Sequence, residues 1–403
     1  MEINKYREDY PFFKNNPDII FFDNASTALK PKCVIDAVNH YYNDLCVNAH
    51  RGDYYLSYKV DVEIEEVRKE VSTFIDCEEN EVAFTSGSTA GMNLISEGYC
   101  KKILKKGDEI LISELEHAAN VLPWFKLAKE TGAVIKYVKL VDKKITLESF
   151  KESITDKTKI ASFAYVSNVL GYKIPAKEMC KVAHENNVLF ILDGAQATPH
   201  IKVSMKDLDC DFFVFSAHKL CWPTGIGVLY VKAELLQECD PVTLGGGMNK
   251  KFEKDGNYVV YNSVRKFEAG TPHIEGILGL GAIVKYINSV GFDFIEKKEK
   301  ELRDKALEGL KKLEHIEIYN EDNDASTITF NIKNVFAQDA ASYFAKYNIC
   351  LRAGQHCAKL IDGVIDTYAS VRCSFYFYNT IEEVNKFIEV ASKGSDFLDA
   401  YFW

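Results

Sequence analysis

Short apolar segments that alternate with amphipathic segments between residues 80 and 232 constrain the fold of this chain more than any other feature. Strands that alternate with helices of such length are typical of βαβ units, in which helices cover both faces of a mainly parallel sheet. The pattern therefore predicts an α/β fold. The apolar segments are residues 81–85, 109–112, 134–138, 160–165, 188–193, 211–216 and 228–231, with amphipathic segments such as 124–132 and 176–187 between them.

The pattern changes after Gly270-Thr271-Pro272, where a long helical region at 275–312 precedes alternating strands and helices. The later elements are expected at residues 316–319, 327–332, 339–347, 368–377 and from 381, with a glycine-containing loop at 353–366. A chain of 403 residues exceeds the usual size of one hydrophobic core. We expect a large domain at 21–287, a smaller α+β domain at 288–403, and an N-terminal segment, 1–20, packed on the small domain.

Charge and composition narrow the classes of partner. The net charge is -10, and lysines and arginines are scattered, which argues against binding to nucleic acid or to an anionic membrane. No apolar run is long enough to span a bilayer, and the N-terminus lacks the pattern of a signal peptide, so we expect a cytoplasmic protein. The 11 cysteines form no CxxC pair, and we expect no metal site.

A lysine and an aspartate follow two of the predicted strands. Lys219 closes an apolar run in Ser216-Ala217-His218-Lys219, and Asp193 ends another in Asp193-Gly194-Ala195-Gln196. Open α/β sheets bind ligands outside the carboxyl ends of their strands. A lysine that forms a Schiff base and an acid that faces a ring nitrogen suit pyridoxal 5'-phosphate. A lone lysine after a strand is, however, more often a surface residue.

Three further segments follow predicted strands. In Ser86-Gly87-Ser88-Thr89 a turn enters a helix, where free N–H groups and hydroxyls suit a phosphate, although serine and threonine are also common helix caps. His117 is suited to stack on a flat ring or to move protons. The alternative is that this histidine has only a structural role. Asn168 lies in Ser167-Asn168-Val169-Leu170-Gly171, where the alternative is a turn residue.

These segments, in this order, resemble the class V aminotransferase-type family of fold-type I pyridoxal-phosphate enzymes, and within it the Suf-type (group II) cysteine desulfurases. The resemblance extends from Phe22-Asp23-Asn24-Ala25-Ser26 to Phe375-Tyr376-Phe377-Tyr378-Asn379. It implies a fold-type I transferase with a large domain and a smaller C-terminal domain. Other segments that support it are Glu116-His117-Ala118-Ala119-Asn120, Pro223-Thr224-Gly225-Ile226-Gly227 and Phe267-Glu268-Ala269-Gly270-Thr271-Pro272.

The resemblance also implies a role for each site residue. Lys219 would form the Schiff base and move the proton at the substrate α-carbon, with His117 stacked on the cofactor ring as a further catalytic residue. The other cofactor-binding residues would be Asp193 at the ring nitrogen, Gln196 at the phenolic oxygen, Ser88, Thr89, Ser216 and His218 at the phosphate, and Thr271 from the second subunit of a homodimer. Asn168 and Arg372 would bind the substrate carboxylate, and His50 would lie near the entrance.

Cys357 indicates the reaction. It lies in Arg352-Ala353-Gly354-Gln355-His356-Cys357, which resembles the motif of the group II nucleophile. The family would convert L-cysteine to L-alanine, leave a persulfide on Cys357, and supply a SufU/SufE-type sulfur acceptor or Suf scaffold for iron-sulfur cluster assembly. Positive charge from the neighbouring His356 is compatible with an activated thiol. The alternative is an inert buried cysteine.

Several positions depart from the family pattern. Ala118 and Gln355 replace histidines, Ser86 replaces an arginine, and Cys221-Trp222 replace Tyr and Gly. These changes leave two other functions open: a selenocysteine lyase or other class V pyridoxal-phosphate enzyme, and a non-catalytic, cofactor-binding scaffold for sulfur transfer.

Overall fold

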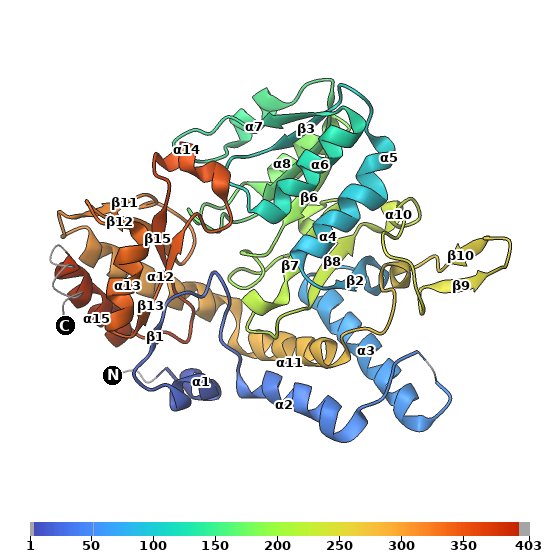
Figure 1. The fold of residues 1–403 in the computed structure, drawn as a ribbon, viewed down its shortest axis with the longest axis horizontal. Helices are drawn as coiled ribbons and strands as arrows, with labels where there is room; N and C mark the ends of the chain where they lie inside the picture. The colour runs from blue at the N-terminus through green and yellow to red at the C-terminus, as the bar shows by residue number, and fades with distance from the viewer. Residues whose placement is uncertain (1–3, 51, 395–403) are drawn as a thin grey trace.

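The computed structural model describes residues 4–50 and 52–394. Its centre is a seven-stranded sheet of order β2-β8-β7-β6-β5-β3-β4 (Figure 1). The strands are β2 (Val82–Thr85), β3 (Glu109–Ile112), β4 (Val134–Tyr137), β5 (Thr158–Ala164), β6 (Leu189–Asp193), β7 (Phe212–Ser216) and β8 (Gly227–Val231).

Successive side chains point to opposite faces of this sheet, and both faces contain buried apolar side chains. In β7, Phe212 and Val214 join one apolar cluster, and Phe213 and Phe215 join the other. Both faces of a mainly parallel sheet are covered in this way because its crossover connections are helices. One cluster contains residues of α4 (Ser88–Ile95) and α6 (Leu122–Thr131), and the other contains residues of α3 (Tyr55–Phe74), α7 (Leu147–Ser153), α8 (Ala176–Glu185) and α11 (Ile274–Val290).

The predicted α/β fold is confirmed, with one exception to the parallel pattern. Strand β8 runs antiparallel to both of its neighbours, β7 and β2. Only residues 217–226 connect β7 to β8, which is too short for the helical crossover that a parallel pair needs. This short connection contains Lys219.

A second sheet is antiparallel and has the order β11-β12-β15-β14. Its strands are β11 (Ile316–Ile318), β12 (Thr327–Ile332), β14 (Arg352–Gly354) and β15 (Ser370–Ser374). Residues of α12 (Phe292–Leu310), α13 (Ala337–Lys346) and α15 (Ile381–Ser392) share its apolar cluster. The small strand pair β1 (Ile20–Phe21) and β13 (Ile349–Cys350) is parallel.

The long helical region expected at 275–312 consists of two helices. Gly291, at φ 83°, separates α11 from α12, and the two axes differ by 75°. Within residues 4–50 and 52–394, no single helix is long and apolar enough to cross a membrane, and only this bent pair passes by length and composition.

The segment before β1 contacts the C-terminal part of the chain. Asn4 Nδ2 donates a hydrogen bond to the Phe377 carbonyl oxygen, and the Arg7 guanidinium forms an ion pair with Glu383. The division at 287/288 stays a prediction. The outer ends of the expected segments, residues 1–3 and 395–403, lie outside the described residues.

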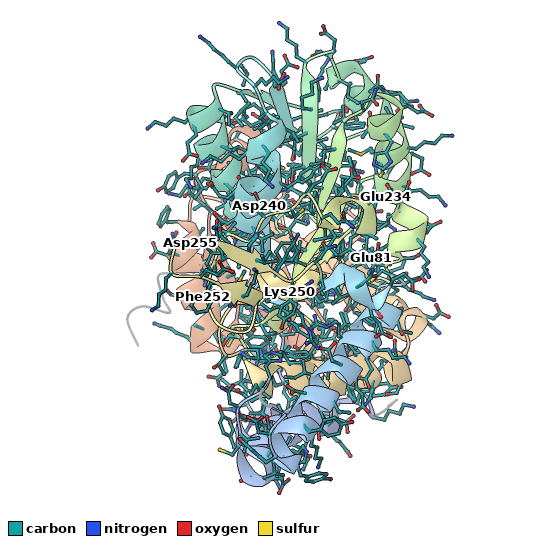
Figure 2. The ribbon with its side chains drawn as sticks, turned by 90° about the vertical axis from the view of Figure 1, so that its right-hand side faces the viewer. Glu81, Glu234, Asp240, Lys250, Phe252 and Asp255 are labelled. Carbon is teal, nitrogen blue, oxygen red and sulfur yellow. The ribbon has the colours of Figure 1, made fainter. Side chains whose placement is uncertain are left out.

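A hairpin of β9 (Asn249–Phe252) and β10 (Tyr258–Val260) extends away from the rest of the molecule at the right of Figure 1. Figure 2 looks toward it from that side, with Phe252 and Asp255 labelled. The Phe252 side chain is 77% exposed.

Candidate active site

One cavity of about 260 Å³ gathers most of the predicted site residues at the carboxyl ends of the central strands. Ser26, Ala119 and Arg352 also line it. The predicted residues that it brings together are Ser88, Thr89, His117, Asn168, Asp193, Ser216, His218, Lys219, Cys357 and Arg372.

The strand ends explain this gathering. Asp193 is the last residue of β6, and Ser216 is the last residue of its parallel neighbour β7, so both side chains lie at one edge of the sheet. Gly194 continues the chain after Asp193, and a Cβ there would lie 1.9 Å from the Phe213 ring. The turn after Asp193 therefore requires glycine.

Lys219 and Asp193 have pKa values shifted by this environment. Burial lowers the pKa of Lys219 to about 8, an effect that Asp193 opposes and Arg372 reinforces. Burial raises the pKa of Asp193, against the effects of Lys219 and of a hydrogen bond from the Ala195 N–H. A lysine with a lowered pKa has a larger share of neutral, nucleophilic amine at neutral pH.

The start of α4 meets the end of β7. The Ser88 N–H donates to Ser216 Oγ over 2.8 Å, and Ser216 Oγ donates to Ser88 Oγ over 3.0 Å. Gly87 precedes the helix at φ 143°, and a Cβ there would lie 3.1 Å from Ser216 Oγ. Hydroxyls and a helix N-terminus thus share one wall of the cavity with His218.

His117 is neutral in this environment. Burial, together with the positive charges of Lys219 and Arg372, lowers its pKa to about 4. Its Nδ1 accepts a hydrogen bond from the Ala119 N–H. An uncharged imidazole at this position is suited to lie against a flat ring.

The guanidinium of Arg372 is buried, forms an ion pair with Asp23 over 3.5 Å and makes two shorter hydrogen bonds. Its Nη1 donates to the Asn168 carbonyl oxygen over 2.6 Å, and its Nη2 donates to Ser26 Oγ over 2.8 Å. Its buried Nε has no hydrogen-bond partner among residues 4–50 and 52–394. An unsatisfied buried donor at a cavity is typical of a site that binds an anion.

His356 does not have the role considered above, in which its positive charge would activate Cys357. Its ring is buried, with Nε2 3.0 Å from Ser370 Oγ on β15, and burial lowers its pKa to about 3. The imidazole is therefore neutral and does not supply positive charge to Cys357. The cationic side chains that line the cavity with Cys357 are Lys219, Arg352 and Arg372.

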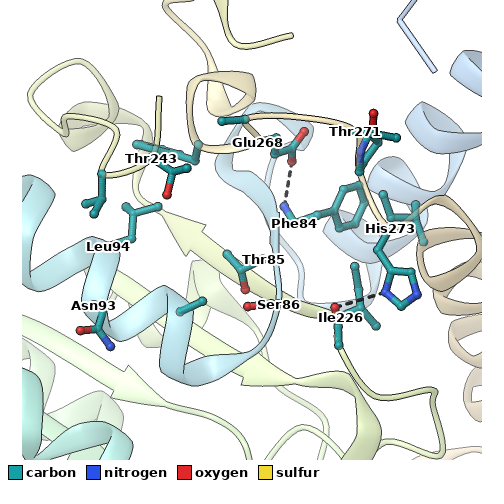
Figure 3. A pocket seen from close by; sticks show the side chains of 17 residues that line it. Phe84, Thr85, Ser86, Asn93, Leu94, Ile226, Thr243, Glu268, Thr271 and His273 are labelled. Atoms are coloured by element: carbon teal, nitrogen blue, oxygen red, sulfur yellow. Dashed lines mark hydrogen bonds between the residues drawn. The ribbon is translucent and has the colours of Figure 1, made fainter. Parts of the chain in front are cut away.

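Three of the predicted residues lie elsewhere. Gln196 Nε2 donates to the Ala25 carbonyl oxygen, and His50 Nδ1 lies 3.5 Å from Asp61 Oδ1. Thr271 is exposed and lines a separate pocket with Thr85 and Ser86 (Figure 3). The roles expected of these residues stay predictions.

Comparison with known proteins identifies the family. The protein family described as "aminotransferase class-V" matches residues 20–387, which is nearly the whole chain.

The chain belongs to the aminotransferase class-V family.

Several relatives of this chain are named as cysteine desulfurases or probable cysteine desulfurases. A probable cysteine desulfurase of Ureaplasma parvum serovar 3 is 39% identical over 391 residues, covering 96% of each chain. The structure of a cysteine desulfurase from Thermococcus onnurineus NA1 has a TM-score of 0.93 at 34% identity, covering 97% of both chains. An Escherichia coli cysteine desulfurase structure has a TM-score of 0.91 at 30% identity, covering 97% of this chain and 98% of that one.

The chemical groups that line the cavity of this aminotransferase class-V family member suit pyridoxal phosphate. The one hydrogen bond that the described residues donate to Asp193 comes from the Ala195 N–H to Oδ1. The other oxygen remains for a protonated ring nitrogen. The hydroxyls of Ser88 and Ser216 and the imidazole of His218 line the same cavity as the Lys219 amine. Its donors for a phosphate, its carboxylate and its amine match the chemical groups of this cofactor.

The sequence analysis predicted no role for some residues at or near this cavity. Ser26 contacts Arg372, and Arg352 lines the cavity. Glu116 is buried and accepts hydrogen bonds from Ser113 Oγ, Asn120 Nδ2 and the Ala164 N–H, and burial raises its pKa to about 7. Each is part of a recognised motif, but its role depends on contacts with segments distant in the sequence.

Proposed function

We propose that this protein is a pyridoxal-phosphate-dependent cysteine desulfurase that converts L-cysteine to L-alanine and leaves the sulfur on Cys357 as a persulfide. The observation that supports the proposal most directly is that Lys219, Arg372 and Cys357 line one cavity. An amine for the cofactor, a guanidinium for a carboxylate and a thiol for a sulfur atom are the three groups that this reaction requires.

The cofactor would be held by the residues at the strand ends. Ser88, Thr89, Ser216 and His218 would contact its phosphate. The Asp193 carboxylate would pair with its ring nitrogen, and His117 would lie against its ring. When bound, pyridoxal phosphate draws electrons away from the bonds at the α-carbon of an amino acid. Lys219 would bind the cofactor and afterwards move the proton at that carbon.

The substrate carboxylate would be bound by Arg372 and Asn168. The Arg372 side chain lines the cavity, and its buried Nε has no hydrogen-bond partner within the described residues. Ser26 and the Asn168 carbonyl orient the guanidinium through its other two nitrogens. This contact would fix the α-carbon relative to Lys219 and the sulfur relative to Cys357.

Sulfur transfer needs no additional oxidant. The Cys357 thiolate would attack the substrate sulfur and form the new S–S bond as the substrate C–S bond breaks. The electron pair of that C–S bond would remain on the substrate carbon, which takes up a proton to give alanine. The outer sulfur of the Cys357 persulfide then comes from the substrate, and atoms and electrons balance. The side chains of Lys219, Arg352 and Arg372 line the same cavity as the Cys357 thiol.

Product analysis tests this proposal. Purified protein with L-cysteine and a reductant should release alanine and sulfide in equal amounts, and Cys357→Ser should reduce sulfide release by about 100-fold or more. Full turnover by Cys357→Ser would contradict the nucleophile assignment. Parallel assays with selenocysteine and with a keto acid as amino acceptor distinguish a selenocysteine lyase or a transaminase, and absence of turnover would favour the non-catalytic scaffold.

The biological setting belongs to the same proposal. The protein would act in the cytoplasm as a homodimer, with Thr271 of each subunit contacting the phosphate bound by the other. The persulfide would pass to a SufU/SufE-type acceptor or Suf scaffold for iron-sulfur cluster assembly. The catalytic thiol would belong to the small domain at 288–403 and the cofactor to the large domain at 21–287, with the N-terminal segment, 1–20, packed on the small one.

A further inference from the structure

We infer that Asn168 is a positioning residue that couples recognition of the substrate carboxylate to the location of the Cys357 thiol. The inference rests on the proposed function, because it concerns the same cavity and the same reaction. It assigns Asn168 a second contact, with the backbone that presents the thiol.

The backbone at the thiol adopts an unusual conformation. His356 has φ 51° and Cys357 has φ 58°, so two consecutive residues with a Cβ lie in the left-handed region. Such residues are uncommon and persist where the surrounding structure fixes them. The position of the Cys357 thiol therefore depends on the contacts that maintain this turn.

In addition to the contact of the His356 ring with Ser370, hydrogen bonds from two other segments bind the carbonyl oxygens of this turn. Asn168 Nδ2 donates to the His356 carbonyl oxygen over 2.8 Å, and the Ala118 N–H donates to the Cys357 carbonyl oxygen over 2.7 Å. Asn168 follows β5, whereas Ala118 follows His117. The turn is thus attached directly to the segments that line the cofactor cavity.

Asn168 is also joined to the residue that would bind the carboxylate. Its carbonyl oxygen accepts the 2.6 Å hydrogen bond from Arg372 Nη1, and its side chain is 6% exposed and lines the cavity. The amide nitrogen has two hydrogens and makes one hydrogen bond within the described residues, so the second remains for a substrate oxygen. One amide group can therefore contact the carboxylate and the His356 peptide together.

This arrangement predicts that substrate binding and thiol placement change together. A carboxylate on Arg372 and Asn168 would restrict the Asn168 amide, and through it the turn at His356 and Cys357. Without the amide, the turn would keep the Ala118 hydrogen bond and the contact between the His356 ring and Ser370, but it would lose its attachment to Asn168.

Hydrogen–deuterium exchange of the holoenzyme tests the coupling. In Asn168→Ala, the segment 354–360 should exchange about threefold or more faster than in the wild type before any amino acid is added. In the wild type, L-alanine should slow exchange in this segment, and in Asn168→Ala it should have little effect. Asn186→Ala is the matched control, because Asn186 Nδ2 donates to the Val182 carbonyl oxygen on an exposed helix surface.

Steady-state kinetics separate positioning from binding alone. For Asn168→Ala, we expect kcat with L-cysteine to fall about tenfold or more together with a rise in KM. A higher KM with unchanged kcat and unchanged exchange at 354–360 would overturn the inference and leave the desulfurase function intact. Loss of the function itself would instead appear as absence of turnover by the wild type.

Asn168→Asp provides the second variant if alanine prevents folding or cofactor binding. It has nearly the shape of asparagine but, when ionised, no donor for the His356 carbonyl. It should therefore also accelerate exchange at 354–360, and unchanged exchange would contradict the inference.

Discussion

At the scale of single residues, the site depends on charge states that burial produces. Lys219 has its pKa lowered to about 8 and His117 has its pKa lowered to about 4, whereas the pKa of Asp193 is raised. Desolvation is the first cause in all three, and it disfavours whichever form is charged. The cavity thus contains a lysine that loses its proton more readily than an exposed one and an imidazole that stays neutral.

The lowered pKa of Lys219 predicts how cofactor uptake depends on pH. Only the neutral amine reacts, so the rate at which cofactor-free protein takes up pyridoxal phosphate should rise with pH and level off near 8. An ordinary lysine, with a pKa of about 10.4, would level off two pH units higher. Stopped-flow absorbance between pH 6 and 10 measures this rate, with Lys219→Ala as the blank. A rate that continues to rise beyond pH 10 would contradict the prediction.

Trp222 is one of the largest side chains in the core and is fully buried. Trp222→Ala should lower the free energy of unfolding by about 3–5 kcal/mol, because it leaves a large cavity. Denaturant unfolding measures the loss. Tyr55→Ala, at a residue that is 74% exposed, is the control and should change stability much less. A loss as small as that of the control would mean that the core collapses around the missing ring.

At the scale of elements, the ends of strands and the start of a helix form the cavity. β6 and β7 end at neighbouring positions, and α4 begins beside the end of β7. Because β7 and β8 are antiparallel, the chain turns back within residues 217–226. This turn places Lys219 at the edge of the sheet where the parallel strands have their carboxyl ends. The arrangement of these three strands thus determines where the amine lies.

Gly87 links these elements, and its substitution tests their role. Its backbone, at φ 143° and ψ 176°, lies in a region that residues with a Cβ rarely adopt. Gly87→Ala should destabilise the turn by about 1–3 kcal/mol and weaken cofactor binding by a corresponding factor. Titration of cofactor-free protein with pyridoxal phosphate measures the affinity.

Gly246→Ala is the matched control for Gly87, because a Cβ at Gly246 would meet no atom within 4 Å. Equal affinity of the two variants would show that the phosphate is not bound at this turn.

At the scale of the whole molecule, Thr271 is expected to complete the cavity of a second subunit, and it does not line the cavity of its own chain. Thr271 lies in a separate pocket with Thr85 and Ser86, as Figure 3 shows. The segment before it is fixed by Glu268, which pairs with the buried Arg68 and accepts a hydrogen bond from the Phe84 N–H. A rigid support for an exposed threonine is consistent with a contact to a second subunit.

Mixed subunits test this prediction. The protein should sediment at twice the 45.7 kDa mass of one chain. A Thr271→Ala homodimer should bind pyridoxal phosphate about tenfold more weakly, through loss of a hydrogen bond to a charged phosphate. Heterodimers of Thr271→Ala with Lys219→Ala would contain one complete site and should regain wild-type affinity in half of their sites. Failure to regain it would place Thr271 outside the partner's site.

The division between sequence and structure follows the range of the interactions. Local periodicity was sufficient to predict the strands of the central sheet, since all of them except the edge strand β4 bury side chains on both faces. It did not predict the antiparallel direction of β8, because direction depends on how residues 217–226 turn back. Periodicity also merged α11 and α12, since an apolar pattern continues across Gly291 although the backbone bends there.

The sequence by itself determined the family, the α/β class and most of the residues that share the cavity, because motifs at strand ends meet at one edge of a parallel sheet. Only the tertiary structure decided the charge and contacts of those residues. His356 precedes Cys357 in the chain, yet its ring turns away to Ser370 and is neutral. Asn168, almost 190 residues away, contacts the thiol turn instead. Burial and long-range hydrogen bonds set these properties, and neither is a property of neighbouring residues in the sequence.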